Sequence, residues 1–461
     1  MATPAERQAA LRYRNDPVFF VRTALNGNPW EKQEEILRSV AEYRRTAVRS
    51  CHGIGKTRVA SWTAVWFLCT HPSSRVITTA PTWFQVKTLL WNEIASIHEQ
   101  APWPLGGSLT TTEWRIGPDW FAIGQSTNKP ERFQGHHAED ILLICDEASG
   151  IAQPIYEASE GFLTSAGSRL LLIGNPTQLA GEFYDAFHSP RKRQLYNTIA
   201  VSAFDTPNLQ AGQTIRPYLI TPEWVEEKRL LWGEESPMWA ARVLGDFPRQ
   251  GSDTLIPLAW IEAAQWRWHE TEPDDEDVVL GVDVARYGTD ATVIMERRGL
   301  RASVWQELRS MDTMRVTGAV VKGFRETNAS AAHVDVIGVG SGVADRLKEQ
   351  EYAVAEMNGA EKPRDTKSYQ NARAEWYWLL RERFRTGEIA IDPDDDVLAG
   401  QLASMKYKYM SNGKLLIESK DDMKARGLPS PDRADALMYA FAPASVGGEW
   451  GDLFAGASVY G

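Results

Sequence analysis

The feature that most constrains the fold is the glycine-containing segment Ser-Cys-His-Gly-Ile-Gly-Lys-Thr at residues 50–57. Residues 46–49 before it predict a short β-strand, and the pattern from Arg58 to Thr70 predicts a helix that Pro72 ends. Strand, glycine loop and helix in this order are the context of a Walker A phosphate-binding loop. We therefore expect the first half of the chain to be an α/β domain with a mostly parallel sheet.

Each polar or flexible residue of this loop has an expected role. Gly53 and Gly55 allow the backbone N–H groups to curl around phosphate oxygens. Lys56 would reach the β and γ phosphates of ATP, and the Thr57 hydroxyl would ligate Mg²⁺. Ser50 stands where the full pattern has its first glycine, so the match is imperfect, and a chance Gly-Lys-Thr in an ordinary loop is the alternative.

A second motif makes that alternative weak. The apolar run at 141–145 predicts a strand buried on both faces, and Asp146 and Glu147 follow it directly. Two adjacent carboxylates at such a place are costly unless they have a function. Asp146 would hold the Mg²⁺ through water, and Glu147 would polarise the attacking water. An acidic helix cap explains either residue alone but not the pair after a phosphate-binding loop, so the sequence predicts an ATPase.

Three further features have equally ordinary alternatives. The Gln33 amide could read adenine, although a surface glutamine is as plausible. The apolar stretch at 171–177 ends in small polar groups, as a γ-phosphate sensor would, or as any β-turn does. Arg132 could act on the ATP of a neighbouring subunit, but an exposed arginine is the common case.

The length of 461 residues allows two or three domains. We expect a P-loop ATPase domain at 1–248, a linker at 249–277 that contains a run of acidic residues, a second domain at 278–444 and a flexible tail at 445–461. Further strands of the first domain are predicted at 75–79, 141–145 and 170–173. In the second domain, three consecutive strands at 278–283, 291–296 and 303–308, then a helix and a strand at 332–336, predict a different α/β fold.

In the second domain, several aspartates lie in or at the ends of predicted strands and at the start of a predicted helix. Asp283 ends the first strand, and Asp335 lies in the fourth. Asp432 and Asp435 share one face at the start of an apolar helix. Asp290 is better explained as a turn residue. The alternative is that each of the other four is an ordinary strand-end or helix cap.

Carboxylates at two strand ends and one helix start can converge on a single point. Because they would repel one another, two divalent ions are the natural compensation, and oxygen ligands favour Mg²⁺ or Mn²⁺ over zinc. Two such ions could activate a water and stabilise the leaving oxygen of a phosphodiester. The second domain is therefore expected to be a two-metal nuclease.

A basic segment lies between Asp335 and Asp432. The turn dipeptide Asn412-Gly413 predicts a hairpin, and tyrosines alternate with its lysines. Such a hairpin could hold the phosphate backbone of DNA. Acidic neighbours also permit a mixed-charge surface hairpin. The candidate DNA-binding residues are Lys406, Lys408, Lys414 and Lys420.

Composition excludes several other classes. The net charge of −11 argues against a generic DNA-coating protein. The charged N-terminus is unlike a signal peptide, and no apolar run approaches the ~18 residues of a membrane helix, so we expect a soluble protein without a membrane partner. Three cysteines without zinc-type spacing fit a reducing interior.

Taken together, these motifs resemble the large terminase family of tailed bacteriophages. The likeness runs from Asn28 to Ala440. Its specificity comes from the order of the motifs, because none of the smaller ones is diagnostic alone. These smaller motifs are at 80–85 (APTWFQ), 133–137 (FQGHH), 174–177 (GNPT) and 204–208 (FDTPN).

The resemblance implies an N-terminal ATPase of the additional-strand catalytic glutamate type and a C-terminal RNase H-like nuclease. Asp283, Asp335 and Asp432 match the family's metal-binding positions, and Asp435 matches a resolvase-like fourth. It further implies that ATP hydrolysis drives double-stranded DNA through the portal into the procapsid and that the nuclease cuts the concatemer. The implied partners are the portal protein, a small terminase subunit and other copies in a ring, in the host bacterial cytoplasm.

Two rival hypotheses remain open at this point. A helicase-nuclease would unwind DNA, but it needs a second ATP-site domain, and only one P-loop half is visible in the sequence. A non-enzymatic docking protein would use the P-loop as a structural switch and carry its acids on the surface.

Overall fold

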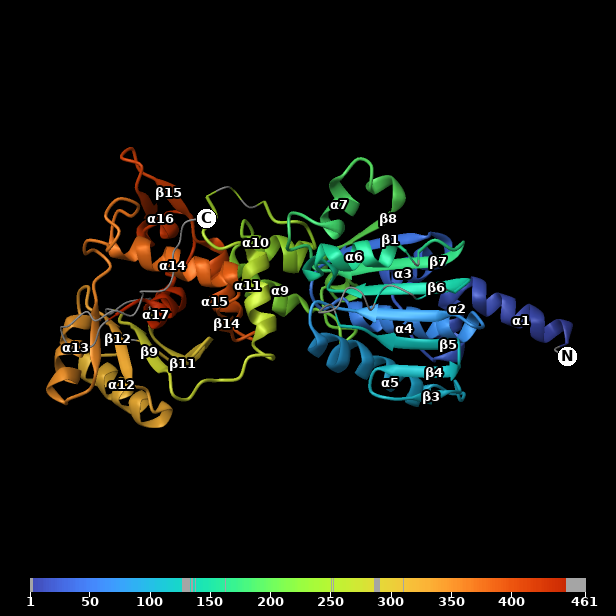
Figure 1. The fold of residues 1–461 in the computed structure, drawn as a ribbon, viewed down its shortest axis with the longest axis horizontal. Coiled ribbons are helices and arrows are strands. Elements are labelled where there is room, and N and C mark those ends of the chain that lie inside the picture. Colours follow the sequence, from blue (N-terminus) through green and yellow to red (C-terminus); the bar gives the residue numbers. More distant parts are fainter. Residues whose placement is uncertain are drawn as a thin grey trace. The chain divides into compact units, whose positions relative to one another are not determined.

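The computed structural model describes residues 3–126, 133, 136, 138–161, 163–249, 251, 253–285, 291–309 and 311–444 (Figure 1). Arg132 and Asp290 lie outside these described residues. The chain divides into two compact units, Met1–Arg249 and Gln250–Gly461.

The first unit contains an eight-stranded sheet with the order β3-β4-β5-β2-β6-β7-β1-β8. All neighbours from β5 to β8 in this order are parallel, and β3 and β4 extend the sheet by antiparallel pairing. The strands are β1 (Arg45–Ser50), β2 (Arg75–Thr79), β3 (Ser108–Leu109), β4 (Glu113–Gly117), β5 (Trp120–Gly124), β6 (Asp140–Asp146), β7 (Gly167–Gly174) and β8 (Asn197–Val201). The mostly parallel sheet predicted for the first half is thus confirmed. Strand β7 lies between the P-loop strand β1 and the acidic strand β6, as the additional-strand type requires.

Helices surround this sheet (Figure 1). They are α1 (Pro4–Asn15), α2 (Pro17–Ala24), α3 (Glu31–Glu42), α4 (Lys56–Thr70), α5 (Trp91–Gln100), α6 (Gln153–Glu160), α7 (Glu182–His188), α8 (Pro207–Ala211), α9 (Pro222–Trp232) and α10 (Pro237–Trp239), with π-helical turns η1 (Gln85–Leu90) and η6 (Ala240–Leu244). Helix α4, which follows the P-loop, is buried on nearly all sides because it contacts α2, α3, α5 and the sheet. The helix predicted for 58–70 is therefore confirmed, and it begins at Lys56.

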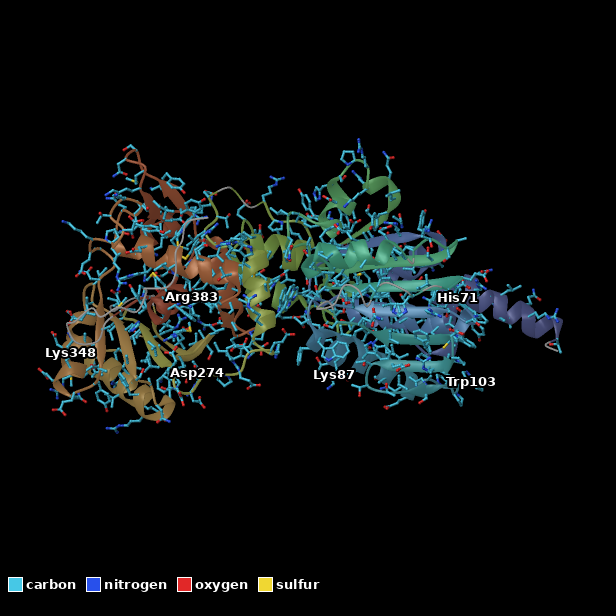
Figure 2. The ribbon with its side chains drawn as sticks, in the orientation of Figure 1. His71, Lys87, Trp103, Asp274, Lys348 and Arg383 are labelled. Atoms are coloured by element: carbon cyan, nitrogen blue, oxygen red, sulfur yellow. The ribbon has the colours of Figure 1, made fainter. Side chains whose placement is uncertain are left out.

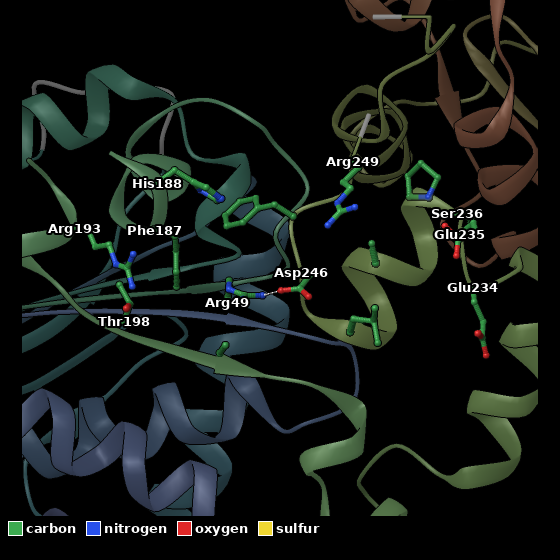
Figure 3. Close-up of a pocket in the computed structure, with 15 residues that line it drawn as sticks. Arg49, Phe187, His188, Arg193, Thr198, Glu234, Glu235, Ser236, Asp246 and Arg249 are labelled. Atoms are coloured by element: carbon green, nitrogen blue, oxygen red, sulfur yellow. Dashed lines mark hydrogen bonds and ion pairs between the residues drawn. The ribbon is translucent and has the colours of Figure 1, made fainter. Parts of the chain in front are cut away.

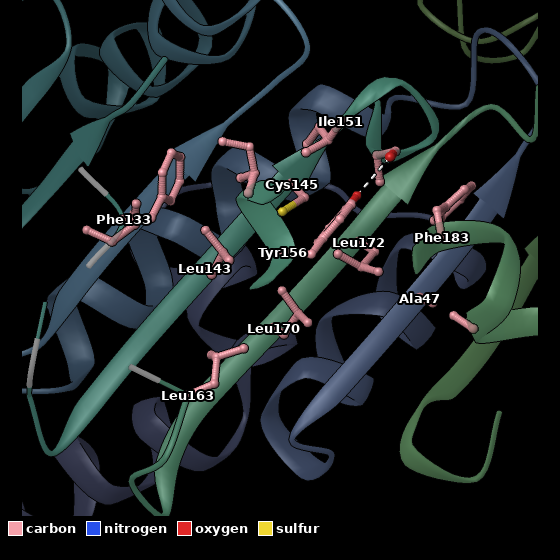
Figure 4. Packing of buried hydrophobic residues seen from close by; sticks show 14 of the residues in the cluster. Ala47, Phe133, Leu143, Cys145, Ile151, Tyr156, Leu163, Leu170, Leu172 and Phe183 are labelled. Carbon is pink, nitrogen blue, oxygen red and sulfur yellow. Dashed lines mark hydrogen bonds between the residues drawn. The ribbon is translucent and has the colours of Figure 1, made fainter. Parts of the chain in front are cut away.

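One apolar cluster lies beneath the acidic end of β6 (Figure 4). Leu143 and Cys145 on β6 and Leu172 on β7 are fully buried in it. The Tyr156 hydroxyl donates a hydrogen bond of 2.8 Å to the carbonyl oxygen of Ala148. This packing fixes the backbone just after Asp146 and Glu147.

The second unit has a six-stranded mixed sheet with the order β13-β12-β9-β10-β11-β14. Its first three strands in the sequence pair antiparallel, and β12 and β13 then add in parallel on the other side of β9. The strands are β9 (Val278–Asp283), β10 (Ala291–Arg298), β11 (Arg301–Arg309), β12 (Ala331–Asp335), β13 (Val354–Met357) and β14 (Ala390–Ile391). The four strands predicted in this half are confirmed, and their arrangement is that of an RNase H-like fold.

Helices and a small hairpin complete the second unit. The helices are α11 (Leu258–Arg267), α12 (Thr313–Thr327), α13 (Gly340–Glu349), α14 (Ala372–Thr386), α15 (Asp396–Ser404), α16 (Lys420–Ala425) and α17 (Asp432–Phe441). The hairpin consists of β15 (Tyr407–Tyr409) and β16 (Leu415–Ile417), and its turn has Gly413 at φ +78°. The predicted hairpin around Asn412-Gly413 is confirmed.

The stretch predicted as a linker, 249–277, is more structured than expected. It contains helix α11, whose Leu258, Ile261 and Ala264 are buried. Gln265 donates to the carbonyl of Pro393, and Arg267 donates to that of Ile389, both within the second unit. The acidic run that suggested a linker is confined to the residues after this helix. In the described ranges, no helix is both long and apolar enough to cross a membrane.

Candidate active sites

The P-loop takes the backbone shape that phosphate binding needs. Gly53 and Gly55 have φ of +65° and +78°. The positive φ at Gly55 favours glycine, and a Cβ there would also stand 2.6 Å from Nε2 of Gln33, so that side chain would have to move. The loop is also fixed from outside, because the Gly53 carbonyl accepts a 2.8 Å hydrogen bond from the backbone N–H of Ile220.

Gln33 holds this loop rather than facing open space. Its side chain is 1% exposed. The amide nitrogen donates to the carbonyls of Ile54 and Gly55, both at 3.3 Å, and its oxygen accepts from the backbone N–H of Trp30 at 3.2 Å. Both ends of the Gln33 amide thus form hydrogen bonds to the backbone, and these bonds position the P-loop. Recognition of adenine by Gln33 stays a prediction.

Lys56 lies at the centre of the first site. Its Nζ donates to Oδ1 of Asn175 at 3.0 Å and stands 3.7 Å from Oε1 of Glu147. Asn175 also donates from Nδ2 to the Ser50 carbonyl at 2.7 Å. The end of β7 thus bridges the P-loop lysine and the acidic loop, which is where a γ-phosphate sensor would sit. Asn175 was not among the predicted site residues, although the stretch containing it was.

Asp146 and Thr57 are brought together as expected of two residues that share one ion. Asp146 is 5% exposed, and the Thr57 hydroxyl is near enough to lower the pKa of its carboxyl. Burial raises the pKa of Asp146 to about 7, and the adjacent Glu147 carboxylate adds to the rise, while Lys56 and Thr57 lower it. A carboxylate in this state is one that a divalent cation would stabilise in its charged form.

Glu147 carries a strained backbone. It has φ +47° and ψ 48°, the left-handed region that residues other than glycine seldom occupy. Its Oε2 accepts a 3.3 Å hydrogen bond from the backbone N–H of Asn175. Such strain is characteristic of functional positions and is consistent with a carboxylate aimed at a reacting water.

A cavity of about 600 Å³ in the first unit is separate from this site (Figure 3). It is lined in part by Arg49, Phe187 and Arg193, and its lining includes none of residues 50–57 and neither carboxylate of the pair at 146–147. Figure 3 shows Arg49 paired with Asp246. Because Arg49 directly precedes the P-loop, this ion pair anchors the base of the loop.

The second site gathers the four predicted carboxylates. Asp283 and Asp335 end the neighbouring parallel strands β9 and β12. Helix α17 brings Asp432 and Asp435 to the same place because it packs closely on β9. A Cβ at Gly281 of β9 would stand 2.2 Å from the carbonyl oxygen of Ala436 on α17, so the close approach depends on this glycine. All four carboxylates are at most 9% exposed.

Lys420 lies among these carboxylates. Its Nζ is 3.0 Å from Oδ2 of Asp435, 3.2 Å from Oδ2 of Asp283 and 3.4 Å from Oδ1 of Asp432. The sequence grouped Lys420 with the hairpin predicted to contact DNA, but the structure places it at the start of α16 with its ammonium in the acidic cluster. Lys406 is also engaged, with Asp253 at 2.8 Å, whereas Lys408 is exposed and Lys414 half-buried.

Charge in this cluster is only partly balanced. Burial raises the pKa of Asp283 well above its usual value, against the opposing effect of Lys420, and burial also raises the pKa of Asp335. Burial would raise the pKa of Asp435 too, but Lys420 and Arg373 together hold it below its usual value. Asp435 is further fixed by the Tyr377 hydroxyl, which donates to its Oδ1 at 2.6 Å.

The donor set fits divalent cations. It consists of carboxylate oxygens, and Oδ2 of Asp435 is buried without a hydrogen-bond donor in the described part of the chain, apart from its ion pair with Lys420. In that part of the chain, no three His, Cys, Asp or Glu side chains stand in an arrangement that would hold a metal ion. Lys420 contacts three of the four carboxylates.

No protein-family profile matches the chain. The probable large terminase subunit of Enterobacteria phage P7 is 26% identical in an alignment 480 positions long, which covers 95% of this chain and 92% of that protein. Among solved structures, the large terminase of the thermophilic bacteriophage D6E has a TM-score of 0.44 and 9% identity over 90% of this chain and 98% of its own. The nuclease domain of the large terminase subunit gp2 of bacterial virus Sf6 has a TM-score of 0.38 and 24% identity over 41% of this chain and 100% of its own.

The fold and the two sites are those of a P-loop ATPase joined to an RNase H-like nuclease. A helicase would need a second ATP-site domain, whereas the second unit here is built on a mixed sheet that carries four aspartates. The resemblance to the large terminase subunits of tailed bacteriophages is confirmed by a relative that spans nearly the whole chain. The first site thus has the residues that ATP hydrolysis uses, and the second has the carboxylates that a metal-dependent nuclease uses.

Proposed function

We propose that this protein is the motor and nuclease of phage DNA packaging: ATP hydrolysis in the first unit moves double-stranded DNA, and the second unit cuts the concatemeric genome. The observation that carries the proposal is the presence, in one chain, of a P-loop centred on Lys56 and of four converging aspartates. The relative that covers 95% of the chain supports it.

In the first unit, the chain's own groups divide the work of hydrolysis. Lys56 would leave Asn175 for the β and γ phosphates, and the P-loop N–H groups would hold the remaining oxygens. Mg²⁺, held by Thr57 and Asp146, neutralises phosphate charge when bound. Glu147 would orient the attacking water and accept its proton, while Asn175, freed from Lys56, would sense the γ-phosphate.

Replacing Glu147 with Gln tests this assignment. The amide keeps the shape of the side chain but cannot accept the proton, so ATP should still bind and hydrolysis should fall by on the order of 10²-fold or more. Steady-state phosphate release and nucleotide binding measure the two effects. Glu157→Gln, an exposed change on α6, is the matched control. Hydrolysis at the wild-type rate in Glu147→Gln would place the base elsewhere.

In the second unit, Asp283, Asp335, Asp432 and Asp435 would hold the metal ions of the nuclease. Two divalent ions supply a nucleophilic water and stabilise the leaving oxygen when bound. Tyr377 and Arg373 position Asp435 by contacts of 2.6 and 3.2 Å, so they act through it. Lys408 and Lys414 on the hairpin could hold the DNA backbone, with Lys406 released from Asp253 when DNA binds.

Lys420 is expected to compete with metal for these oxygens. Lys420→Ala should therefore raise the affinity for Mn²⁺ by at least about tenfold, since the carboxylates lose their internal counter-ion. Isothermal titration with Mn²⁺ measures the change, and Lys322→Ala, a mostly exposed lysine on α12, is the control. A lower affinity in Lys420→Ala would show that the lysine helps to build the site.

The partners follow from the same proposal. A ring of subunits on the procapsid portal, working with a small terminase subunit in the host cytoplasm, would place each ATP site next to a neighbouring copy. Arg132 remains the proposed residue that acts on the neighbour's ATP.

A packaging reaction tests the whole proposal. Purified protein, linear double-stranded DNA and portal-bearing procapsids are mixed with ATP, and DNA protected from added nuclease is measured. Protection should require ATP and intact procapsids together. ATP-dependent strand separation without protection would instead favour the helicase-nuclease, and no ATP dependence in any reaction would favour the docking protein.

A further inference from the structure

The second unit contains a cavity of about 980 Å³ that none of the four aspartates lines. Its walls include Trp378 and Arg383 of α14 and Phe441 at the end of α17. Leu379, also in the wall, is a large apolar side chain left 40% exposed. The last described residues, 442–444, form part of the rim. The cavity is thus largely apolar, and the described part of the chain ends in its lining, at Ala444.

Arg383, which Figure 2 labels, lines the cavity among charged residues of both signs, namely Arg297, Arg385, Asp277, Glu382 and Glu388. Its guanidinium lies 5.3 Å from the ring centre of Phe441 and, within the described ranges, forms no hydrogen bond or ion pair. Burial lowers the pKa of Arg383, and the neighbouring Arg297 lowers it further, while Glu388 and Asp277 oppose this without contact. Asp277 is already bound by Arg297 through two contacts of 2.7 and 2.8 Å. Unused guanidinium donors in such a place favour an anionic group.

The residues that follow the rim have the matching chemistry. The segment 445–461 contains no lysine or arginine, and its charges are Glu449 and Asp452. Between and beside these carboxylates stand Trp450, Leu453 and Phe454. An extended chain spans at most about 3.6 Å per residue, so the five residues from 445 to 449 allow a reach of about 18 Å from the rim.

We propose that the segment 449–454 of the same chain docks in this cavity, with a carboxylate on Arg383 and aromatic rings against Trp378, Leu379 and Phe441. The carboxylate would make a charge-assisted hydrogen bond where little water competes. The rings would cover apolar surface that is otherwise exposed. The cavity is separate from both active sites. The docking proposal can therefore be right or wrong independently of the packaging proposal.

Hydrogen exchange on the full-length chain tests this docking. The backbone amides of 449–454 should exchange at least about tenfold more slowly than in a synthetic peptide of residues 445–461. Arg383→Glu should bring their rates to those of the free peptide, and Arg383→Gln should do so in part. Arg346→Glu, the same charge change on α13 of the same unit, should leave the protection unchanged.

Three results would overturn the proposal. Wild-type rates equal to those of the free peptide would show that the cavity does not hold the segment. Protection that survives Arg383→Glu in a folded protein would place the segment elsewhere. Protection that disappears on dilution would mean that the cavity binds the segment of a second copy instead.

Discussion

Lys56→Ala is expected to abolish ATP hydrolysis, with a loss of at least about 10³-fold, and to stop DNA packaging completely. The lysine ammonium cancels charge that develops on the transferred phosphoryl group. In the described first unit, no other cation lies within reach of both the P-loop and the Glu147 carboxylate. The structure shows it poised between Asn175 at 3.0 Å and Glu147 at 3.7 Å. Phosphate release and DNA protection inside procapsids measure the two losses.

The control tests whether the loss of a lysine charge elsewhere in the same unit also lowers hydrolysis. Lys87→Ala removes an exposed lysine of the same unit, labelled in Figure 2, and should leave hydrolysis unchanged. Nuclease activity of Lys56→Ala on plasmid DNA should persist, because the aspartates belong to the other compact unit. Full ATPase activity in Lys56→Ala would remove the P-loop assignment.

The parts of both sites that the sequence predicts are those with a local signal. A phosphate-binding loop needs its glycines, lysine and threonine in consecutive positions, so one segment defines it. Apolar runs that end in Asp146 or Asp283 predict both a buried strand and the place where its carboxylate emerges. The sheet order in each unit then follows the fold that these motifs imply.

The missed parts depend on contacts between distant segments. The stretch 171–177 suggested a γ-phosphate sensor, but it did not indicate that the amide of Asn175 meets Lys56, which is 119 positions away. Lys420 is 137 positions from Asp283, and its own neighbours suggested a surface hairpin. Helix α11 was missed because the acidic run that follows it dominates the local composition, whereas its apolar face becomes meaningful only when it packs on α14 and α15.

Gln33 is a further residue whose contacts the sequence does not predict. A lone glutamine predicts a hydrogen-bonding amide without indicating its partner. In the structure both ends of that amide are engaged by the backbone at Trp30, Ile54 and Gly55. The glycine at 55 and the glutamine at 33 therefore depend on each other, and this dependence is visible only in three dimensions.

Removing one carboxylate of the second site is expected to stop DNA cleavage while ATP hydrolysis survives. Asp283→Ala, Asp335→Ala and Asp432→Ala should each lower the nicking rate by on the order of 10³-fold. Each change removes a ligand of the two metal ions, which would then stabilise the transition state less by several kcal/mol. EDTA should stop the wild type, and Mn²⁺ or Mg²⁺ should restore it. Ca²⁺ should support cutting poorly, because its looser coordination holds the reacting oxygens less well in line.

The comparison must distinguish lost ligation from lost folding. Asp283 is 2% exposed and is one of three carboxylates in contact with Lys420, so its removal takes away part of the lysine's counter-charge, and Asp283→Asn offers a variant of nearly the same shape. Plasmid nicking is measured on the full-length protein, with circular dichroism and ATPase activity as checks on the fold, and Asp345→Asn on the exposed face of α13 as the control. Asp435→Ala should be milder if its bonds to Tyr377 and Arg373 reflect a supporting role. A folded Asp283→Asn or Asp335→Ala protein that nicks DNA at the wild-type rate would refute the metal cluster, and the second unit would then be a docking domain for DNA or portal.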